Sequence, residues 1–351
     1  MSSNFYDVVI AGAGPAGSTC ATLCAEAGLR TLLLEKGTFP RDKVCGDCLN
    51  PGCWPVLDQL GVSNEILASP HLPIPNVSFV AASHRLTLPL HSTPPGEIAI
   101  TRRLLDDILL RRAARAGADV RQNTPICTLS SDPTGLWHIG PHMTPLLVAA
   151  DGRNSTVARL LGSAPPAHRD RVGLQSHAPT PPDLGHGIEL HLFPEGYCGT
   201  APVGHGLTNF CLVATAADLT ALRSAVCTRF DLPATLEWHA IAPLERAPIG
   251  PLLNGVAYIG DAARVVEPFT GEGIYYALHS ARLAARHIIA GTLAAYPATH
   301  AALYRRRLWI NRLARWAVTH PRAGALLLRT LSIHPPSLEF LVQRVTGPHP
   351  T

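Results

Sequence analysis

The sequence predicts an α/β fold with an inserted, mainly antiparallel β domain and helices at the C-terminal end, and three observations support this class. Residues 8–11 form a continuously apolar strand, typical of a buried parallel sheet, that leads into a glycine-rich turn and a helix. Residues 256–259 repeat this order near the far end of the chain. Between them, residues 77–90 and 172–213 alternate apolar and polar side chains and contain prolines, which is typical of antiparallel strands.

The first unit contains the glycines that a dinucleotide pyrophosphate requires. Its turn has the pattern Gly-x-Gly-x-x-Gly and is followed by a helix at 18–27 and a second apolar strand at 31–34. Gly12 permits the tight turn, Gly14 lets the backbone approach a pyrophosphate, and Gly17 lets the helix pack closely on the strand. The N-terminus of that helix favours the negative charge of the phosphates.

Glu35 ends the second strand, where its carboxylate is positioned to accept a hydrogen bond from a ribose 2′-hydroxyl. An acid at this position disfavours a 2′-phosphate, which leaves FAD and NAD as the expected dinucleotides. The residues predicted to bind the dinucleotide here are Gly12, Ala13, Gly14, Pro15, Ala16, Gly17 and Glu35.

The second unit predicts the other end of the same ligand. Asp261 follows the strand at 256–259, and a glycine-rich segment then opens a helix at 275–290. The Asp261 carboxylate is expected to accept from a ribityl hydroxyl, and the amides near Gly273 and Ile274 are expected to donate to a flavin pyrimidine ring. Gly271 belongs to the same segment.

Composition and charge exclude several classes of protein. Apolar residues make up 46% of the 351 residues and net charge is +4, so the chain is neither disordered nor generally basic enough to bind nucleic acid. The nine cysteines are odd in number and irregularly spaced, which predicts reduced thiols. With no signal peptide or transmembrane segment expected, we predict a cytoplasmic protein, at most at the inner face of a membrane.

Four segments together resemble the FAD-dependent hydroxylase and reductase superfamily that includes para-hydroxybenzoate hydroxylase. They are residues 41–46, 102–109, 150–155 and 268–277. The last of them is most similar to the geranylgeranyl reductase family. The resemblance implies FAD as cofactor and a Rossmann-like FAD-binding domain of the glutathione reductase type. It also implies cofactor contacts for Lys36, Cys45, Gly46, Arg102, Asp151 and Gly152.

The same resemblance predicts how the chain is divided. A discontinuous FAD-binding domain is expected to comprise residues 1–70, 96–165 and 250–300. A substrate domain is expected to comprise residues 71–95 and 166–249. Residues 301–351 are expected to form a C-terminal helical segment.

Cys45 is the predicted catalytic residue, because the resemblance places it over the flavin, where its thiol supplies a proton. Three alternatives remain for Cys45 and Cys48, which form a Cys-x-x-Cys pair: a zinc site that lacks a motivated fourth ligand, a redox dithiol, and small buried thiols. Asp47 departs from the family, which often has a second glycine there, and this puts the local loop geometry in question. No histidine has metal-ligand spacing, so we predict no metal.

The C-terminal segment is strongly basic. Residues 301–351 carry eight arginines and one glutamate, which leaves a net charge of −3 for the first 300 residues. Between residues 301 and 345, apolar residues and tryptophans recur near helical spacing, which is typical of a helix on an anionic membrane surface. The alternative is that this apolar face packs on the rest of the protein.

The function predicted from these features is hydride transfer from reduced FAD to a carbon–carbon double bond of a small apolar or lipid-like substrate. The external reductant is expected to be NADPH, NADH or ferredoxin. The main alternative is an FAD-dependent monooxygenase that hydroxylates or epoxidises an aromatic, polyketide or isoprenoid substrate. A non-catalytic flavin- or lipid-binding protein is a further alternative; the missing paired-tryptophan motif disfavours a halogenase.

Overall fold

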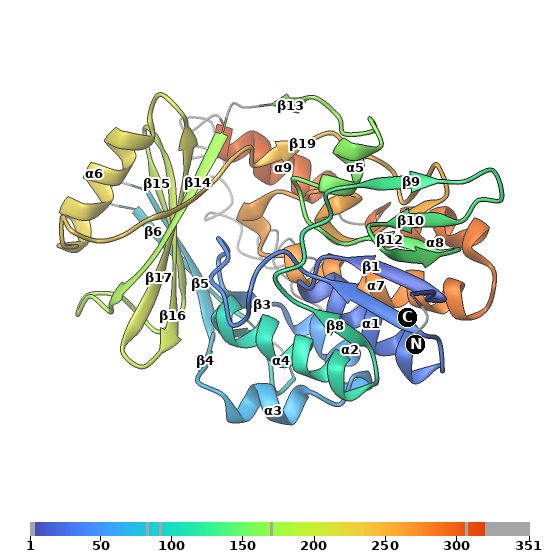
Figure 1. The fold of residues 1–351 in the computed structure, drawn as a ribbon. Coiled ribbons are helices and arrows are strands. Elements are labelled where there is room, and N and C mark those ends of the chain that lie inside the picture. Colours follow the sequence, from blue (N-terminus) through green and yellow to red (C-terminus); the bar gives the residue numbers. More distant parts are fainter. Residues whose placement is uncertain (1–3, 82–83, 91–92, 169–170, 306–307, 320–351) are drawn as a thin grey trace.

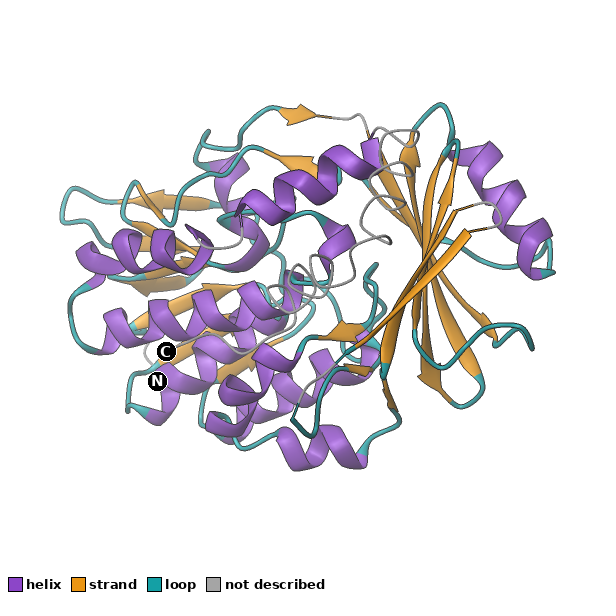
Figure 2. Ribbon diagram, turned by 180° about the vertical axis from the view of Figure 1, so that it is seen from behind, coloured by secondary structure: helices purple, strands orange, loops and turns teal. Residues whose placement is uncertain are grey.

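A computed structural model describes residues 4–81, 84–90, 93–168, 171–305 and 308–319. Two large sheets lie in opposite halves of the molecule (Figure 1), and the helices gather mainly around one of them (Figure 2). This arrangement confirms the predicted α/β class with a second, mainly antiparallel sheet.

A six-stranded sheet forms the first half, in the order β20-β21-β12-β1-β2-β8, and all its neighbours are parallel except β20 and β21. Its core strands are short and buried because nearly every residue in them is apolar. The strand bounds are β1 Val8–Ala11, β2 Thr31–Leu34, β8 Asp119–Arg121, β12 Leu147–Ala149, β20 Leu252–Leu253 and β21 Val256–Tyr258.

Alternate residues of these strands pack into two separate cores. Val8 and Ile10 face helices α1 (Pro15–Glu26), α4 (Arg102–Arg115) and α7 (Gly273–Ile289). Val9 and Ala11 face the opposite side, where a small antiparallel sheet covers them. The strands of that sheet are β9 Leu129–Ser131, β10 Trp137–Ile139 and β11 His142–Thr144.

A seven-stranded sheet forms the second half, in the order β18-β14-β17-β16-β15-β5-β6, and its only parallel neighbours are β15 and β5. Helix α6 (Leu219–Phe230) covers its outer face by packing on Phe210 and Leu212. The strand bounds are β5 Asn76–Ala81, β6 His84–Pro89, β14 Arg171–Pro179, β15 Ile188–Phe193, β16 Gly196–Gly204, β17 Leu207–Thr215 and β18 His239–Ile241.

Short elements connect the two halves. A three-stranded sheet with the order β3-β7-β4 lies between them, and a two-stranded sheet pairs β13 with β19. The bounds are β3 Cys48–Leu49, α2 Trp54–Gln59, α3 Ser63–Ala68, β4 Leu72–Pro73, β7 Ile98–Ala99, α5 Thr156–Leu160, β13 Ala167–His168, β19 Glu245–Arg246, α8 Tyr296–Arg305 and α9 Leu308–Thr319.

The sequence predicted some elements and missed others. The alternating segment 77–90 forms two antiparallel strands, β5 and β6. Sheet β9–β11 and helices α2, α3 and α6 were not predicted, because their short or weakly periodic sequences carry little pattern. A turn at 204–206 joins β16 to β17, with positive φ angles at all three residues.

Helix α9 packs on the body of the protein through Asn311, whose side chain accepts from the Glu267 amide and donates to Glu272. Trp309 and Trp316 on the same helix are 46% and 44% exposed. Residues 320–345 of the predicted amphipathic segment lie outside the described residues, so membrane contact stays a prediction. Among the helices that the structure describes, none is long and apolar enough to cross a bilayer.

Candidate functional site

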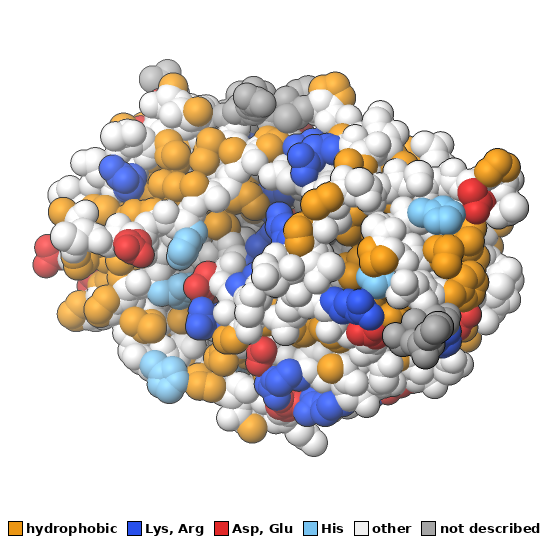
Figure 3. All heavy atoms as spheres, viewed as in Figure 1, with side chains coloured by type: hydrophobic (Ala, Val, Ile, Leu, Met, Phe, Trp, Pro, Cys, Tyr) orange, Lys and Arg blue, Asp and Glu red, His pale blue; other side chains and the backbone are white. Residues whose placement is uncertain are grey.

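A cleft of about 640 Å³ lies between the two halves. Its first half is at the carboxyl ends of β1, β2 and β12, the edge at which open α/β sheets bind ligands. Its second half is the inner face of the seven-stranded sheet. Figure 3 shows basic side chains in the hollow where the two halves meet.

The glycine-rich turn is shaped by close backbone approaches. Gly12 has a φ of +95°, and a Cβ there would lie 2.7 Å from the Ala150 carbonyl oxygen. A Cβ at Gly17 would lie 1.8 Å from the Gly12 carbonyl oxygen, so only glycine allows α1 to begin this close to β1. At Gly14, by contrast, the nearest atom to a Cβ is 4.0 Å away, which leaves the turn open toward the cleft.

Glu35 fixes the loops on either side of it. Its carboxylate accepts from the Ala13 amide at 2.8 Å and from the Gly37 amide at 2.9 Å, and the side chain is buried. Each oxygen still has a lone pair available, so the carboxylate remains able to accept from a ribose hydroxyl.

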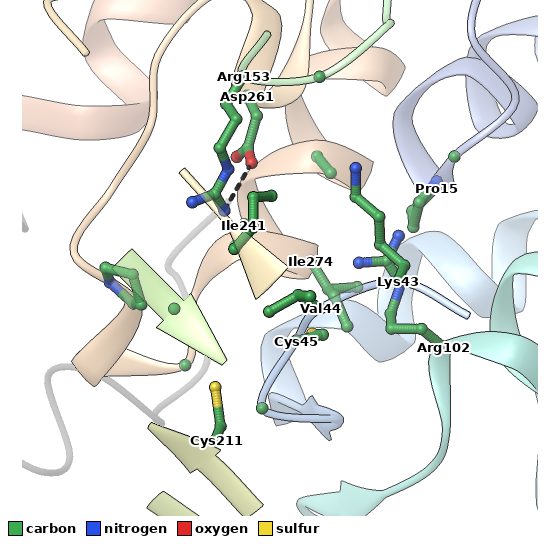
Figure 4. A pocket seen from close by; sticks show the side chains of 18 of the residues that line it. Pro15, Lys43, Val44, Cys45, Arg102, Arg153, Cys211, Ile241, Asp261 and Ile274 are labelled. Carbon is green, nitrogen blue, oxygen red and sulfur yellow. Dashed lines mark hydrogen bonds and ion pairs between the residues drawn. The ribbon is translucent and has the colours of Figure 1, made fainter. Parts of the chain in front are cut away.

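Five basic residues line the cleft on this side: Lys36, Arg41, Lys43, Arg102 and Arg153. Figure 4 shows Lys43, Arg102 and Arg153 among them. Burial and the charges of Arg102, Arg41 and Arg153 lower the pKa of Lys43 to about 8. Asp106 is fully buried and accepts two hydrogen bonds from Arg102, at 2.6 and 2.7 Å. This ion pair holds Arg102 at the start of α4, with Lys43 beside it (Figure 4).

Two carboxylates on the same side of the cleft as these basic residues have different environments. Asp261 forms a 3.3 Å ion pair with Arg153, drawn in Figure 4, and its side chain is 30% exposed. Asp151 instead caps α5, because one of its oxygens accepts from the Thr156 and Val157 amides. Its other oxygen is buried and has no hydrogen-bond partner within the described residues.

The observed groups fit the diphosphate of a dinucleotide. Arg153 Nε and Nη1 are buried and have no hydrogen-bond partner within the described chain. The mutual repulsion that lowers the pKa of Lys43 is relieved by a nearby anion. Helices α1 and α7 both begin at the cleft, where their first amide groups are available to donate.

The loop of Cys45 to Asp47 joins the two halves of the cleft. The Cys45 amide donates to Gln175 at 3.2 Å, and its carbonyl accepts from Asn209 at 2.8 Å. Asp47 has a φ of +56°, a conformation that favours glycine and that aspartate tolerates. An aspartate can therefore occupy this loop position, where the family often has glycine.

Asp47 itself is buried and anchors the loop from both sides. One carboxylate oxygen accepts from the Arg102 amide at 3.2 Å. The other accepts from Gln175 at 3.2 Å and lies 2.7 Å from His177 Nε2. Burial raises the pKa of Asp47, and the hydrogen bond with His177 opposes that shift.

The thiols in this region are protonated at neutral pH. Burial raises the pKa of Cys45, and it raises that of Cys48 further. Because a thiolate is the nucleophile in disulfide chemistry, these environments disfavour a redox dithiol. Within the described ranges, no three His, Cys, Asp or Glu side chains gather in a way that would hold a metal ion.

The second half of the cleft is apolar. Strand alternation places one set of residues of β15, β16 and β17 toward the cleft and the other set toward α6. Figure 4 shows Cys211 on the strand wall and Cys45 on the loop that faces it. The apolar lining includes Val77, Phe79, Leu90, Ile188, Leu190, Leu192, Val213 and Phe269.

All of the residues predicted for the site line the cleft except two. Ala13 and Gly17 lie behind the turn, where they shape it. The residues that line the cleft are Gly12, Gly14, Pro15, Ala16, Glu35, Lys36, Cys45, Gly46, Arg102, Asp151, Gly152, Asp261, Gly271, Gly273 and Ile274.

Sequence reasoning missed several lining residues. Three of them, Arg41, Lys43 and Arg153, lie in the segments that resemble the superfamily. Their positions in those segments could have predicted that they line the site. Glu97 belongs to no motif. Nothing in the local sequence distinguishes it from a surface or core residue.

Comparisons with known proteins agree with this geometry. A family model described as an FAD binding domain matches residues 5–185. The chain is 31% identical over 367 residues to menaquinone reductase from Mycolicibacterium smegmatis, covering 93% of this chain and 89% of that protein. It is 25% identical over 322 residues to digeranylgeranylglycerophospholipid reductase from Thermoplasma volcanium, covering 80% of this chain and 77% of that protein.

Among solved structures, a myxobacterial chondrochloren halogenase superposes with a TM-score of 0.76 at 21% identity, covering 97% of this chain and 95% of that one. The fold and the cleft therefore define a flavin-dependent oxidoreductase. The chain belongs to the FAD binding domain family.

Proposed function

We propose that this protein reduces a carbon–carbon double bond of an apolar, isoprenoid-type substrate. The observation that carries the proposal is the division of one cleft into a basic half suited to a diphosphate and an apolar half beside it. The similarity to menaquinone and digeranylgeranylglycerophospholipid reductases supports the same class of substrate. The halogenase likeness concerns the fold alone.

The residues of the basic half would hold FAD. Glu35 would accept from the adenosine ribose, and Arg102, Lys43 and Arg153 would bind the diphosphate. The first amides of α7 would face the flavin ring system. Reduced FAD, when bound, supplies the hydride.

Cys45 would supply the proton that completes the reduction. Its thiol keeps a proton at Sγ at neutral pH because burial raises its pKa. It lines the cleft at the junction of the basic and apolar halves. A hydride and a proton together saturate one double bond.

Replacing Cys45 tests this role. We expect Cys45→Ala to lower kcat about 10²-fold, the smaller end of the range for general acid catalysis, with unchanged FAD content. Cys211→Ala is the matched control, since Cys211 also lines the cleft but lies on the strand wall. Equal kcat in the Cys45→Ala variant and the unmodified protein would show that the proton comes from elsewhere.

The proposed reaction is tested anaerobically. NADPH, NADH and reduced ferredoxin are each added to the FAD-loaded protein, and bleaching of the flavin absorbance identifies the donor. Menaquinone is then added, and we expect the flavin to be reoxidised under nitrogen. Two hydrogens gained by the isoprenoid side chain, measured after air oxidation of the ring, would distinguish double-bond reduction from quinone reduction. Oxygen uptake that depends on menaquinone and places oxygen in the product would favour the monooxygenase alternative.

A further inference from the structure

Glu97 is a buried carboxyl group in the apolar half of the cleft. The residue is only 7% exposed, it lines the cleft, and its Oε2 has no hydrogen-bond partner within the described residues. The backbone is fixed, because Glu97 immediately precedes β7 and its carbonyl accepts from the Ile74 amide at 2.9 Å. The fixed backbone thus holds this carboxyl group, with one unsatisfied oxygen, in the wall of the cleft.

Among the described residues, no cation is paired with Glu97. The adjoining apolar cluster consists of Ile74, Ala99, Ala201 and Val203, with Cys48, Leu90 and Ile188 packed against it.

Four titratable side chains on described elements near Glu97 are either protonated thiols or have other partners. Burial raises the pKa of the Cys48 thiol on β3, and it raises that of Cys211 on β17 to about 12. His71, just before β4, has its Nδ1 2.9 Å from the Ser69 carbonyl oxygen. Glu189 on β15 pairs with Arg85 and His191 on the other face of the sheet. Burial alone raises the pKa of Glu97, to about 7.

We propose that the Glu97 carboxyl determines specificity by donating a hydrogen bond to a carbonyl oxygen of an otherwise apolar substrate. This inference rests on the proposed function and names the polar group that its substrate carries. A buried polar group without a partner destabilises a fold, and a ligand that supplies the partner recovers that loss on binding. Substrate pockets commonly combine apolar walls with a few such groups.

The chemistry favours a carbonyl over an amine. In its neutral form the carboxyl has a proton to donate and needs no countercharge. An ammonium ligand would require the ionised form, and both charges would then lose their hydration in an apolar wall without further donors. A quinone or ketone oxygen therefore fits this end of the cleft.

Two probes of matched shape test the proposal on the oxidised, FAD-loaded protein. Duroquinone carries two carbonyl oxygens, and durene is the corresponding hydrocarbon. We expect calorimetric titration to show that duroquinone binds roughly three- to tenfold more tightly than durene, the contribution of one neutral hydrogen bond. Glu97→Gln keeps a donor and should keep this preference, whereas Glu97→Leu should abolish it and leave durene affinity unchanged.

The pH dependence gives a second readout. The preference for duroquinone should fall as pH rises from 6 to 8, because ionised Glu97 has no proton to donate, and it should be constant in Glu97→Gln. A preference that survives in Glu97→Leu, or one that grows with pH, would overturn the proposal. Tighter binding of benzylammonium than of duroquinone would also overturn it, by pointing to an ionised carboxylate.

This test is independent of turnover. FAD content and thermal unfolding are measured for both variants, and we expect Glu97→Leu to be at least as stable as the unmodified protein because it removes an unpaired buried polar group. If the anaerobic reduction fails while the duroquinone preference holds, the proposed reaction falls and the Glu97 site stands. The opposite result removes the Glu97 site alone.

Discussion

The basic half of the cleft is held by backbone geometry and ion pairs, whereas the apolar half is held by strand alternation. In the basic half, Gly12 and Gly17 are required by close backbone approaches, and Arg102 is fixed by Asp106. In the apolar half, Leu190 and Leu192 face the cleft only because their strand presents every second residue to it. Residues of the first half are therefore constrained individually, and those of the second are exchangeable for others of similar size.

Removal of the Arg102–Asp106 ion pair in the basic half is expected to have the largest effect. Arg102→Met should lower the free energy of unfolding by about 3–5 kcal/mol, because buried Asp106 loses two short hydrogen bonds and keeps only a 3.7 Å ion pair with Arg41. The double variant Arg102→Met/Asp106→Leu should recover most of that stability without recovering FAD affinity. Chemical denaturation and flavin content measure the two effects. A double variant as unstable as the single one would show that Arg102 acts on stability by packing.

Adding a methyl group to the glycine-rich turn is expected to cause a smaller loss of stability. Gly17→Ala should lower the free energy of unfolding by about 3 kcal/mol, since its Cβ would meet the Gly12 carbonyl. Gly14→Ala has room for the methyl group and should weaken FAD binding about tenfold, equivalent to ~1.4 kcal/mol, while the apo-protein keeps its stability. Equal thermal shifts in the two variants would contradict this separation.

Substitutions in the apolar half of the cleft should change KM rather than FAD content. Leu192→Trp should raise KM about tenfold by filling the cleft and should leave FAD content unchanged. Phe193→Trp is the matched control, because the adjacent side chain packs on the outer face with the α6 core. Steady-state kinetics with equal KM values for both variants would show that the apolar wall does not bind substrate.

The smallest effect concerns the charge of Lys43. FAD affinity should fall about fivefold between pH 7 and pH 9, because Lys43, with a pKa of about 8, loses its proton over this range and then attracts the diphosphate less. Lys43→Met should bind FAD weakly with little change over the same range. Fluorescence titration of apo-protein with FAD gives both curves, and parallel slopes would mean that another group titrates.

The same difference between the two halves determines which site residues could be predicted from the sequence. Gly12, Gly14 and Glu35 were predictable because a turn and a strand end impose residue types over a short stretch. The convergence of Arg41 with Arg153 depends on how distant segments pack, and no local spacing encodes it. Glu97 was missed for the same reason, since its burial arises from the β7 sheet and the facing strands.

In the proposed function, the apolar half of the cleft receives a substrate that is reduced rather than oxygenated. The most direct measurement is a single turnover of photoreduced, FAD-loaded protein with menaquinone, analysed by mass spectrometry under nitrogen and under ¹⁸O₂. We predict a product whose isoprenoid side chain, after air oxidation of the ring, carries two additional hydrogens under nitrogen and no ¹⁸O under oxygen. A product that forms only with oxygen and contains ¹⁸O would show that the substrate is oxygenated.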